Sequence, residues 1–151
     1  MILISHRGNT TGPAPATENS PDYIAKALQS GYNVEIDVWR VGKKWFLGHD
    51  TPQYEVNCSY LNNKNLWCHA KNIDALTEML SMGVHCFWHQ EDKYTLTSKG
   101  YVWAYPSKHN SNISSCIDVL PENIFDINCY SPDTAGVCSD FIEIIGNNNN
   151  A

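Results

Sequence analysis

Short apolar runs alternate with polar turns along most of the chain and predict eight short strands. Each run is about as long as an ordinary strand, and Gly, Pro, Asn or Ser residues bound it. The expected strands are Ile2–His6, Asn33–Trp39, Trp45–Gly48, Leu66–Lys71, His85–His89, Tyr101–Tyr105, Cys116–Leu120 and Gly136–Asp140. The Val-Gly-Lys-Lys turn at 41–44 should join the second and third strands as an antiparallel hairpin.

Two helices are expected between these strands. Pro21–Ser30 begins after Ser20, a favourable N-cap residue. Ile73–Met82 begins after Asn72 in the same way, and a glycine follows each helix. The order strand, helix, strand, helix, strand predicts right-handed crossovers and a parallel sheet through the first four main strands. After residue 100 the helical pattern fades.

Composition places the chain among globular proteins. Its 151 residues are 42% hydrophobic, which predicts one domain over residues 1–146 and a disordered Asn-rich tail over 147–151. The net charge of -6 argues against nucleic-acid binding. No apolar run or basic leader suggests a transmembrane or secretory segment, so a cytoplasmic protein is expected. Six cysteines without CxxC spacing predict free thiols. The oligomeric state stays open.

Two acidic side chains share one face of the second predicted strand. Alternate residues of a strand point the same way, so Glu35 and Asp37 project together while their apolar neighbours project to the other side. A strand inside a parallel sheet is covered on both faces, and two carboxylates buried there require a cation or a raised pKa. A divalent metal with oxygen ligands meets that requirement. The alternative is an edge strand on which both are hydrated surface charges.

The fourth predicted strand places a ligand-type residue and a cation on one face. His69 and Lys71 alternate there with apolar residues. Two interpretations of Lys71 stay open. It forms a buried ion pair with the strand carboxylates, or it holds a phosphoryl oxygen.

Two histidines stand where predicted strands end. His6 and Arg7 precede Gly8, and His49 and Asp50 follow the third strand. Sites in parallel α/β folds form at the carboxyl ends of the strands. Imidazole titrates close to neutral pH, so two such histidines near carboxylates and cations indicate general acid and base catalysis. A structural role for each histidine is the alternative.

Four separated motifs resemble those of the glycerophosphodiester phosphodiesterase family, in the same order and with similar spacing. They are His6-Arg7-Gly8, Glu18-Asn19-Ser20 before a helix, Glu35-Ile36-Asp37-Val38 and Gly48-His49-Asp50. The likeness is specific over residues 1–50 and continues more loosely through His69-Ala70-Lys71 and the last predicted strand.

The resemblance implies a (β/α)₈ barrel that cleaves phosphodiesters between a glycerol-type or lipid alcohol and a second alcohol, with a divalent metal. It implies an acid and base at His6 and His49, phosphate binding at Arg7 and Lys71, metal ligands at Glu35 and Asp37, and a supporting carboxylate at Glu18. The expected partner is a small-molecule phosphodiester, cleaved by water or through a cyclic phosphate.

Two departures from the family pattern change these expectations. His69 stands where the family has a third acidic ligand. The resemblance implies Mg²⁺ or Ca²⁺, and a histidine ligand adds Mn²⁺ and Zn²⁺ as alternatives. An eight-fold barrel typically needs roughly 250 residues and rarely fewer than about 200. The 151 residues here therefore predict a reduced (β/α) barrel of seven or eight short strands, with helices mainly in the first half.

Other polar residues at strand ends are expected to support the site, namely Asp50, His89 and Asp140. Two other functions stay open. One is a non-catalytic phosphate- or metal-binding domain on a degenerate barrel. The other is a metal-dependent hydrolase of a different bond that uses His69 and His89 beside the carboxylates.

Overall fold

The computed structural model describes residues 1–106, 108, 112–130 and 133–149. Within them the chain folds as a mixed α/β structure with a ten-stranded curled sheet and three α-helices. The strands are β1 (Ile2–His6), β2 (Asn33–Val41), β3 (Lys44–Leu47), β4 (Tyr54–Val56), β5 (Leu66–Ala70), β6 (Cys86–Phe87), β7 (Tyr94–Leu96), β8 (Val102–Ala104), β9 (Cys116–Val119) and β10 (Gly136–Ser139). The helices are α1 (Pro21–Gln29), α2 (Ile73–Ser81) and α3 (Ile142–Asn149), with short 3₁₀ turns η1 (Cys58–Asn62) and η2 (Pro121–Asn123).

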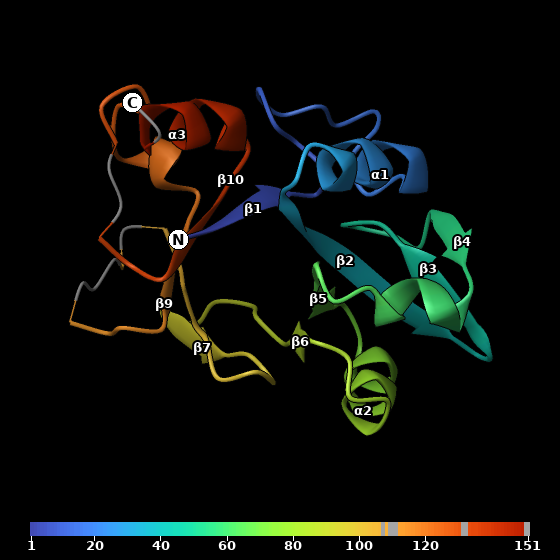
Figure 1. The fold of residues 1–151 in the computed structure, drawn as a ribbon. Helices are drawn as coiled ribbons and strands as arrows, with labels where there is room; N and C mark the ends of the chain where they lie inside the picture. The colour runs from blue at the N-terminus through green and yellow to red at the C-terminus, as the bar shows by residue number, and fades with distance from the viewer. Residues whose placement is uncertain (107, 109–111, 131–132, 150–151) are drawn as a thin grey trace.

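Parallel pairing runs through seven strands in the order β6-β5-β2-β1-β10-β9-β8. The far end of β2 turns back into β3, which pairs with β4, and β7 pairs antiparallel with β8. The sheet curls into an open half-barrel (Figure 1). Within the described residues no strand ladder joins β6 to β8. This seam is bridged by a hydrogen bond from Ser98 N–H to Cys86 O (2.8 Å) and by the rings of Phe87 and Trp103, whose centroids are 4.6 Å apart.

Two apolar layers hold the sheet. On the outer face α1 and α2 pack against β2 and β5, and Val34, Ile36 and Val38 of β2 are fully buried there. The concave face has its own cluster, to which six strands contribute Ile4, Trp67, Phe87, Trp103, Ile117 and Cys138. Because β2 gives its apolar side chains to the outer layer, its alternate residues Glu35 and Asp37 point to the inner side.

Most of the predicted elements are confirmed. The eight predicted strands correspond to β1, β2, β3, β5, β6, β8, β9 and β10, and the two predicted helices to α1 and α2. The parallel start of the sheet and the hairpin at 41–44 are also as predicted. The Asn72 side chain caps α2 by accepting from Ala75 N–H (3.0 Å), whereas Ser20 makes no such bond at α1.

Three elements correct the expectation from sequence. The edge strands β4 and β7 raise the number of strands to ten, against the seven or eight expected. A third helix, α3, lies in the second half of the chain, where the helical pattern of the sequence fades. It continues through Asn149, so residues 147–149 of the predicted disordered tail are helical, while residues 150–151 lie outside the described residues. Ile142 and Ile145 are fully buried and anchor α3, in a cluster with Val137 of β10.

The cysteines and the helices bear on two further expectations. All six cysteines are free thiols, as predicted, and four of them are buried. Among the described residues, every helix is too short or too polar to cross a membrane.

Candidate functional site

A cavity of about 420 Å³ opens at the carboxyl ends of the parallel strands. Seven of the residues predicted from sequence line it: His6, Arg7, Glu35, His49, His69, Lys71 and His89. They come from β1, β2, β5 and the segments that follow β3 and β6. The structure therefore brings together, in one cavity, side chains that are up to 83 positions apart in the sequence, from His6 to His89.

Two buried carboxylates and an imidazole form a compact cluster at this cavity, which Glu35 and His69 line and Asp37 adjoins. Glu35 is 2% exposed and Asp37 is 1% exposed. Parallel pairing of β2 with β5 sets Asp37 opposite His69, whose Nδ1 lies 3.1 Å from Asp37 Oδ1 and 3.7 Å from Glu35 Oε1. One ligand atom from each of the three residues lies within 4.8 Å of the other two. Both carboxylates are thus inner-face residues of a covered strand, and the surface-charge alternative is wrong.

The orientation of His69 is fixed from its other ring nitrogen. Nε2 lies 2.9 Å from the carbonyl oxygen of His89. A carbonyl can only accept, so Nε2 carries a proton and donates. The ring also stacks on Phe87, with centroids 5.1 Å apart and planes 5° from parallel. Nδ1 is thereby aimed at the two carboxylates, in the arrangement by which a backbone carbonyl commonly orients a metal-binding histidine.

Asp37 is surrounded by groups that stabilise its negative charge. Arg7 Nε lies 3.1 Å from Oδ2, and Lys71 Nζ lies 3.4 Å from Oδ1. The Asn19 side chain donates to Oδ2 and accepts from the Asp37 backbone N–H, both at 2.9 Å. Burial alone would raise the pKa of Asp37, but the bond to His69 and the charges of Arg7 and Lys71 outweigh it and hold this pKa well below its usual range.

The surroundings of Glu35, unlike those of Asp37, disfavour its negative charge. Burial and the neighbouring charge of Asp37 raise the pKa of Glu35, although His6 and His69 oppose the shift. Within the part of the chain that the structure describes, Glu35 Oε2 is buried without a hydrogen-bond partner, and Asp37 Oδ1 has the ion-pair contacts of His69 and Lys71. Buried acceptors without a donor are costly, so the pair is arranged for something that donates or carries positive charge.

The donor set fits a divalent cation. Two carboxylates and one imidazole are common metal ligands, and Glu35, whose Oε2 has no hydrogen-bond partner among the described residues, belongs to the cluster. An all-oxygen set would favour Mg²⁺ or Ca²⁺, whereas the nitrogen of His69 suits Mn²⁺ or Zn²⁺ better.

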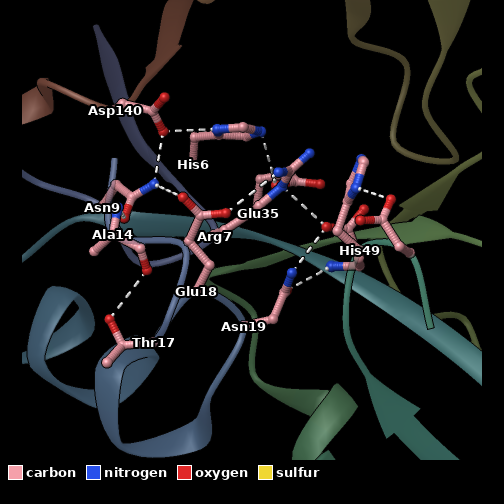
Figure 2. A network of polar contacts seen from close by, with 12 residues as sticks. His6, Arg7, Asn9, Ala14, Thr17, Glu18, Asn19, Glu35, His49 and Asp140 are labelled. Atoms are coloured by element: carbon pink, nitrogen blue, oxygen red, sulfur yellow. Dashed lines mark hydrogen bonds and ion pairs between the residues drawn. The ribbon is translucent and has the colours of Figure 1, made fainter. Parts of the chain in front are cut away.

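A second network, of polar side-chain contacts, fixes His6 through its Nδ1. Its Nδ1 lies 2.7 Å from Asp140 Oδ1, and the Asn9 side chain donates both to the same oxygen (2.8 Å) and to Glu18 Oε1 (2.9 Å). Figure 2 shows this chain of contacts running from His6 through Asp140 and Asn9 to Glu18 and on to Arg7. Burial lowers the pKa of His6, but the bond to Asp140 and the charge of Glu35 outweigh it and raise this pKa above the usual value. Nε2 of His6 faces the cavity side, 3.9 Å from Glu35 Oε2.

His49 reaches the cavity on a loop. Its side chain is 42% exposed, and Nδ1 lies 2.7 Å from Asp50 Oδ1. Gly48 has a φ of 147°, and a Cβ there would lie 2.2 Å from Thr51 O, so glycine is required where the chain leaves β3. Gly48 N–H donates to Asp37 O (3.1 Å), which ties the loop to β2.

The remaining predicted residues have supporting positions. Glu18 and Asp140 do not line the cavity but hold Arg7 and His6, as described, and Asp50 is an exposed partner of His49. The His89 side chain is 11% exposed, with Nδ1 3.8 Å from Asp92 Oδ2. Burial and the nearby charge of His69 lower the pKa of His89, so it favours the neutral imidazole.

Two asparagines were missed as functional residues. Asn9 is fully buried and Asn19 is 1% exposed, and together they connect His6, Arg7 and Asp37. Asn19 lies inside the Glu18-Asn19-Ser20 motif and has a φ of 62°, a conformation that asparagine tolerates better than most residues. Asn9 lies in a polar loop, and no sequence pattern marks it.

The chain matches no family model, no curated protein and no solved structure. The functional argument therefore depends on the chemistry of the cavity.

Proposed function

We propose that the chain is a metal-dependent phosphodiesterase that cleaves a glycerophosphodiester-like or lipid-derived phosphodiester, with His6 and His49 as general acid and base. The observation that carries the proposal is one cavity lined by both imidazoles, by the cations Arg7 and Lys71, and by two members of the metal-ligand cluster, Glu35 and His69. The motif resemblance over residues 1–50 supports the same assignment. We interpret the curled sheet as a reduced (β/α) barrel, because its parallel strands carry the site at their carboxyl ends.

Arg7 and Lys71 bind the phosphate in this proposal. Each is paired with Asp37 in the structure. A guanidinium has five N–H donors and an ammonium group has three, so each cation holds its carboxylate and still donates to a non-bridging oxygen. Cations positioned where negative charge develops lower the barrier of phosphoryl transfer.

Glu35, Asp37 and His69 would hold the divalent ion, which supplies further positive charge next to the phosphate when bound. His6 moves a proton at Nε2, because Nδ1 is engaged with Asp140, and that carboxylate stabilises the imidazolium form. One of His6 and His49 accepts the proton of the attacking hydroxyl, and the other protonates the leaving alcohol oxygen. The attacking hydroxyl belongs to water or to the substrate itself, and in the second case a cyclic phosphate forms first.

The test is cleavage of a diester panel, from glycerophosphocholine to an activated aryl diester, by chelator-stripped protein with Mg²⁺, Ca²⁺, Mn²⁺ or Zn²⁺ added back. His6→Ala and His49→Ala should each reduce turnover by about 10²–10⁴-fold. His85→Gln is the matched control, because His85 bonds to Thr97 (3.0 Å) and does not line this cavity. An aryl monoester and an anilide in the same panel report on a hydrolase of a different bond.

A non-catalytic phosphate- or metal-binding domain is the second candidate. The exposure of His49 favours it, because among the described residues its imidazole pairs with Asp50, whose side chain is 89% exposed, whereas His6 is held by the largely buried Asp140. This candidate predicts that inorganic phosphate or Mn²⁺ binds and raises the melting temperature while no diester is cleaved with any metal. Metal-dependent turnover that both alanine variants abolish would exclude it.

A further inference from the structure

A second pocket, of about 110 Å³, adjoins the cavity of the candidate site. Tyr105 and Val119 line both, so the two spaces share a wall. The other lining residues come from the ends of β8 and β9, from η2 and from the segment that follows it: Ala104, Asp118, Pro121, Ile124, Phe125 and Tyr130.

The mouth of this pocket is apolar and exposed. Tyr105, Ile124 and Phe125 are each 47% exposed, although large apolar side chains are usually covered. Phe125 stacks on Tyr130, with ring centroids 5.5 Å apart, and the stack forms one wall. Single exposed apolar residues are ordinary, but several around one concave space mark a binding site.

The polar groups at the floor are already satisfied. Tyr130 Oη donates to Asp118 Oδ2, and both residues are buried. The carboxylate is therefore engaged within the protein and does not demand a cationic or hydrogen-bonding ligand. What the pocket offers to a ligand is mainly apolar surface.

We propose that this pocket binds the apolar part of one alcohol of the substrate, a short alkyl chain or an aromatic ring, while the phosphate occupies the adjoining cavity. This inference rests on the proposed function. An engineered cavity of about 150 Å³ holds benzene, so a pocket of 110 Å³ with an open mouth holds about four carbons of a chain or most of a ring. The substrate class is then a phosphodiester with an apolar alcohol rather than one built only of glycerol and polar head groups.

A small ligand fits this surface better than a protein partner does. The mouth presents three exposed apolar side chains, whereas a standard protein interface uses roughly 20–30 residues a side. The pocket is also concave and shares Tyr105 and Val119 with the candidate site. A single molecule can therefore place a phosphate in one space and an apolar group in the other.

Alkyl phosphates test the inference without any cleavage. Dissociation constants of inorganic, methyl, propyl, butyl and phenyl phosphate are measured by calorimetry on the metal-loaded full chain. Each methylene buried should tighten binding about fourfold, up to about four carbons. Phe125→Ala and Ile124→Ala should remove most of this dependence and leave methyl phosphate within about twofold. Leu96→Ala is the control, because Leu96 is 68% exposed on β7 and does not line the pocket.

The outcomes separate the inference from the function on which it rests. Phosphate binding with no effect of chain length, or an effect that persists in both pocket variants, would overturn the apolar subsite and leave the phosphodiesterase standing. Inorganic phosphate that fails to bind at all would overturn the proposed phosphate site and the subsite with it. A change in sedimentation mass in Phe125→Ala, with the chain-length effect intact, would show that the mouth pairs two copies of the chain instead.

Discussion

Replacing each strand carboxylate by its amide should change the stability of the metal-free protein in opposite directions. We expect Glu35→Gln to stabilise the fold and Asp37→Asn to destabilise it. Asp37 is paired with Arg7 and Lys71 and accepts from Asn19. Glu35 has a buried oxygen without a hydrogen-bond partner among the described residues, and its raised pKa reports an unfavourable charge.

The expected changes in the free energy of unfolding follow from the distances between the charged groups. Ligand oxygens of Glu35 and Asp37 lie within 4.8 Å of each other, and at an effective dielectric constant of about 20 two unit charges at that separation repel by about 3 kcal/mol. His6 and His69, at 3.9 and 3.7 Å from Glu35, offset part of this repulsion. A net gain of about 1–2 kcal/mol is expected for Glu35→Gln. Asp37→Asn removes the buried counter-charge of the partly buried Arg7 and Lys71, of which Arg7 keeps Glu18, and should cost about 3 kcal/mol.

Urea unfolding at pH 7 with a chelator present measures both values. Glu55→Gln is the control, because Glu55 forms only an exposed pair with Lys44 and should change stability by less than about 1 kcal/mol. Saturating Mn²⁺ should stabilise the wild type by mass action and stabilise both variants less. If Glu35→Gln destabilised the metal-free protein, the charge of Glu35 would not be unfavourable. If Asp37→Asn left stability unchanged, the neighbouring cations would not be stabilising the charge of Asp37.

Three other predictions concern pH, proton transfer and the backbone. Burial lowers the pKa of His85 to about 4, so the unfolded chain binds a proton that the folded chain excludes, and stability should fall as the pH drops from about 6.5 towards 4. Urea unfolding across this range should show a loss of up to about 3 kcal/mol, and a smaller one in His85→Gln. Asp140→Asn removes the charged partner of His6, so kcat on any cleaved diester should fall about 10²-fold and the pKa of His6 in the pH–rate profile should move down. Gly48→Ala, with its Cβ 2.2 Å from Thr51 O and a φ of 147°, should cost roughly 2–4 kcal/mol, measured as a lowered melting temperature.

Local patterns were sufficient to predict much of the fold and of the site. Alternation in β2 correctly separated Glu35 and Asp37 from the apolar residues on the other face, because side-chain direction in a strand depends only on position parity. The same argument for β5 set His69 beside them, since parallel neighbours share a register. Strand ends predicted the positions of His6 and His49, which both line the cavity.

What the sequence did not predict depends on distant contacts. The bond between His6 and Asp140 joins residues 134 positions apart, and the bond between Asn9 and Asp140 spans 131. The helix α3 contains Gly146 and ends in an Asn run, and both residue types are poor helix formers. It forms because Ile142 and Ile145 pack against β1 and β10, which is tertiary stabilisation that intrinsic propensity does not report.

The strands that carry the proposed site are joined by hydrogen-bonded ladders, whereas within the described residues β6 and β8 meet at a seam without one. His6, the proposed phosphate-binding cations and the proposed metal residues stand on or next to β1, β2 and β5, which continuous parallel ladders join, whereas His49 lies on the loop after β3. Reacting groups must be held within about 0.5 Å of their productive geometry. Paired strands with a fixed register provide that precision. The seam between β6 and β8 is bridged instead by ring contacts such as Phe87 with Trp103, and apolar contacts are not directional. The apolar pocket lies at the ends of β8 and β9, which parallel ladders join to β10 and β1. An open half-barrel can therefore lack the ladder between β6 and β8 and still hold the proposed site, because β1, β2 and β5, which carry most of its residues, remain joined to one another.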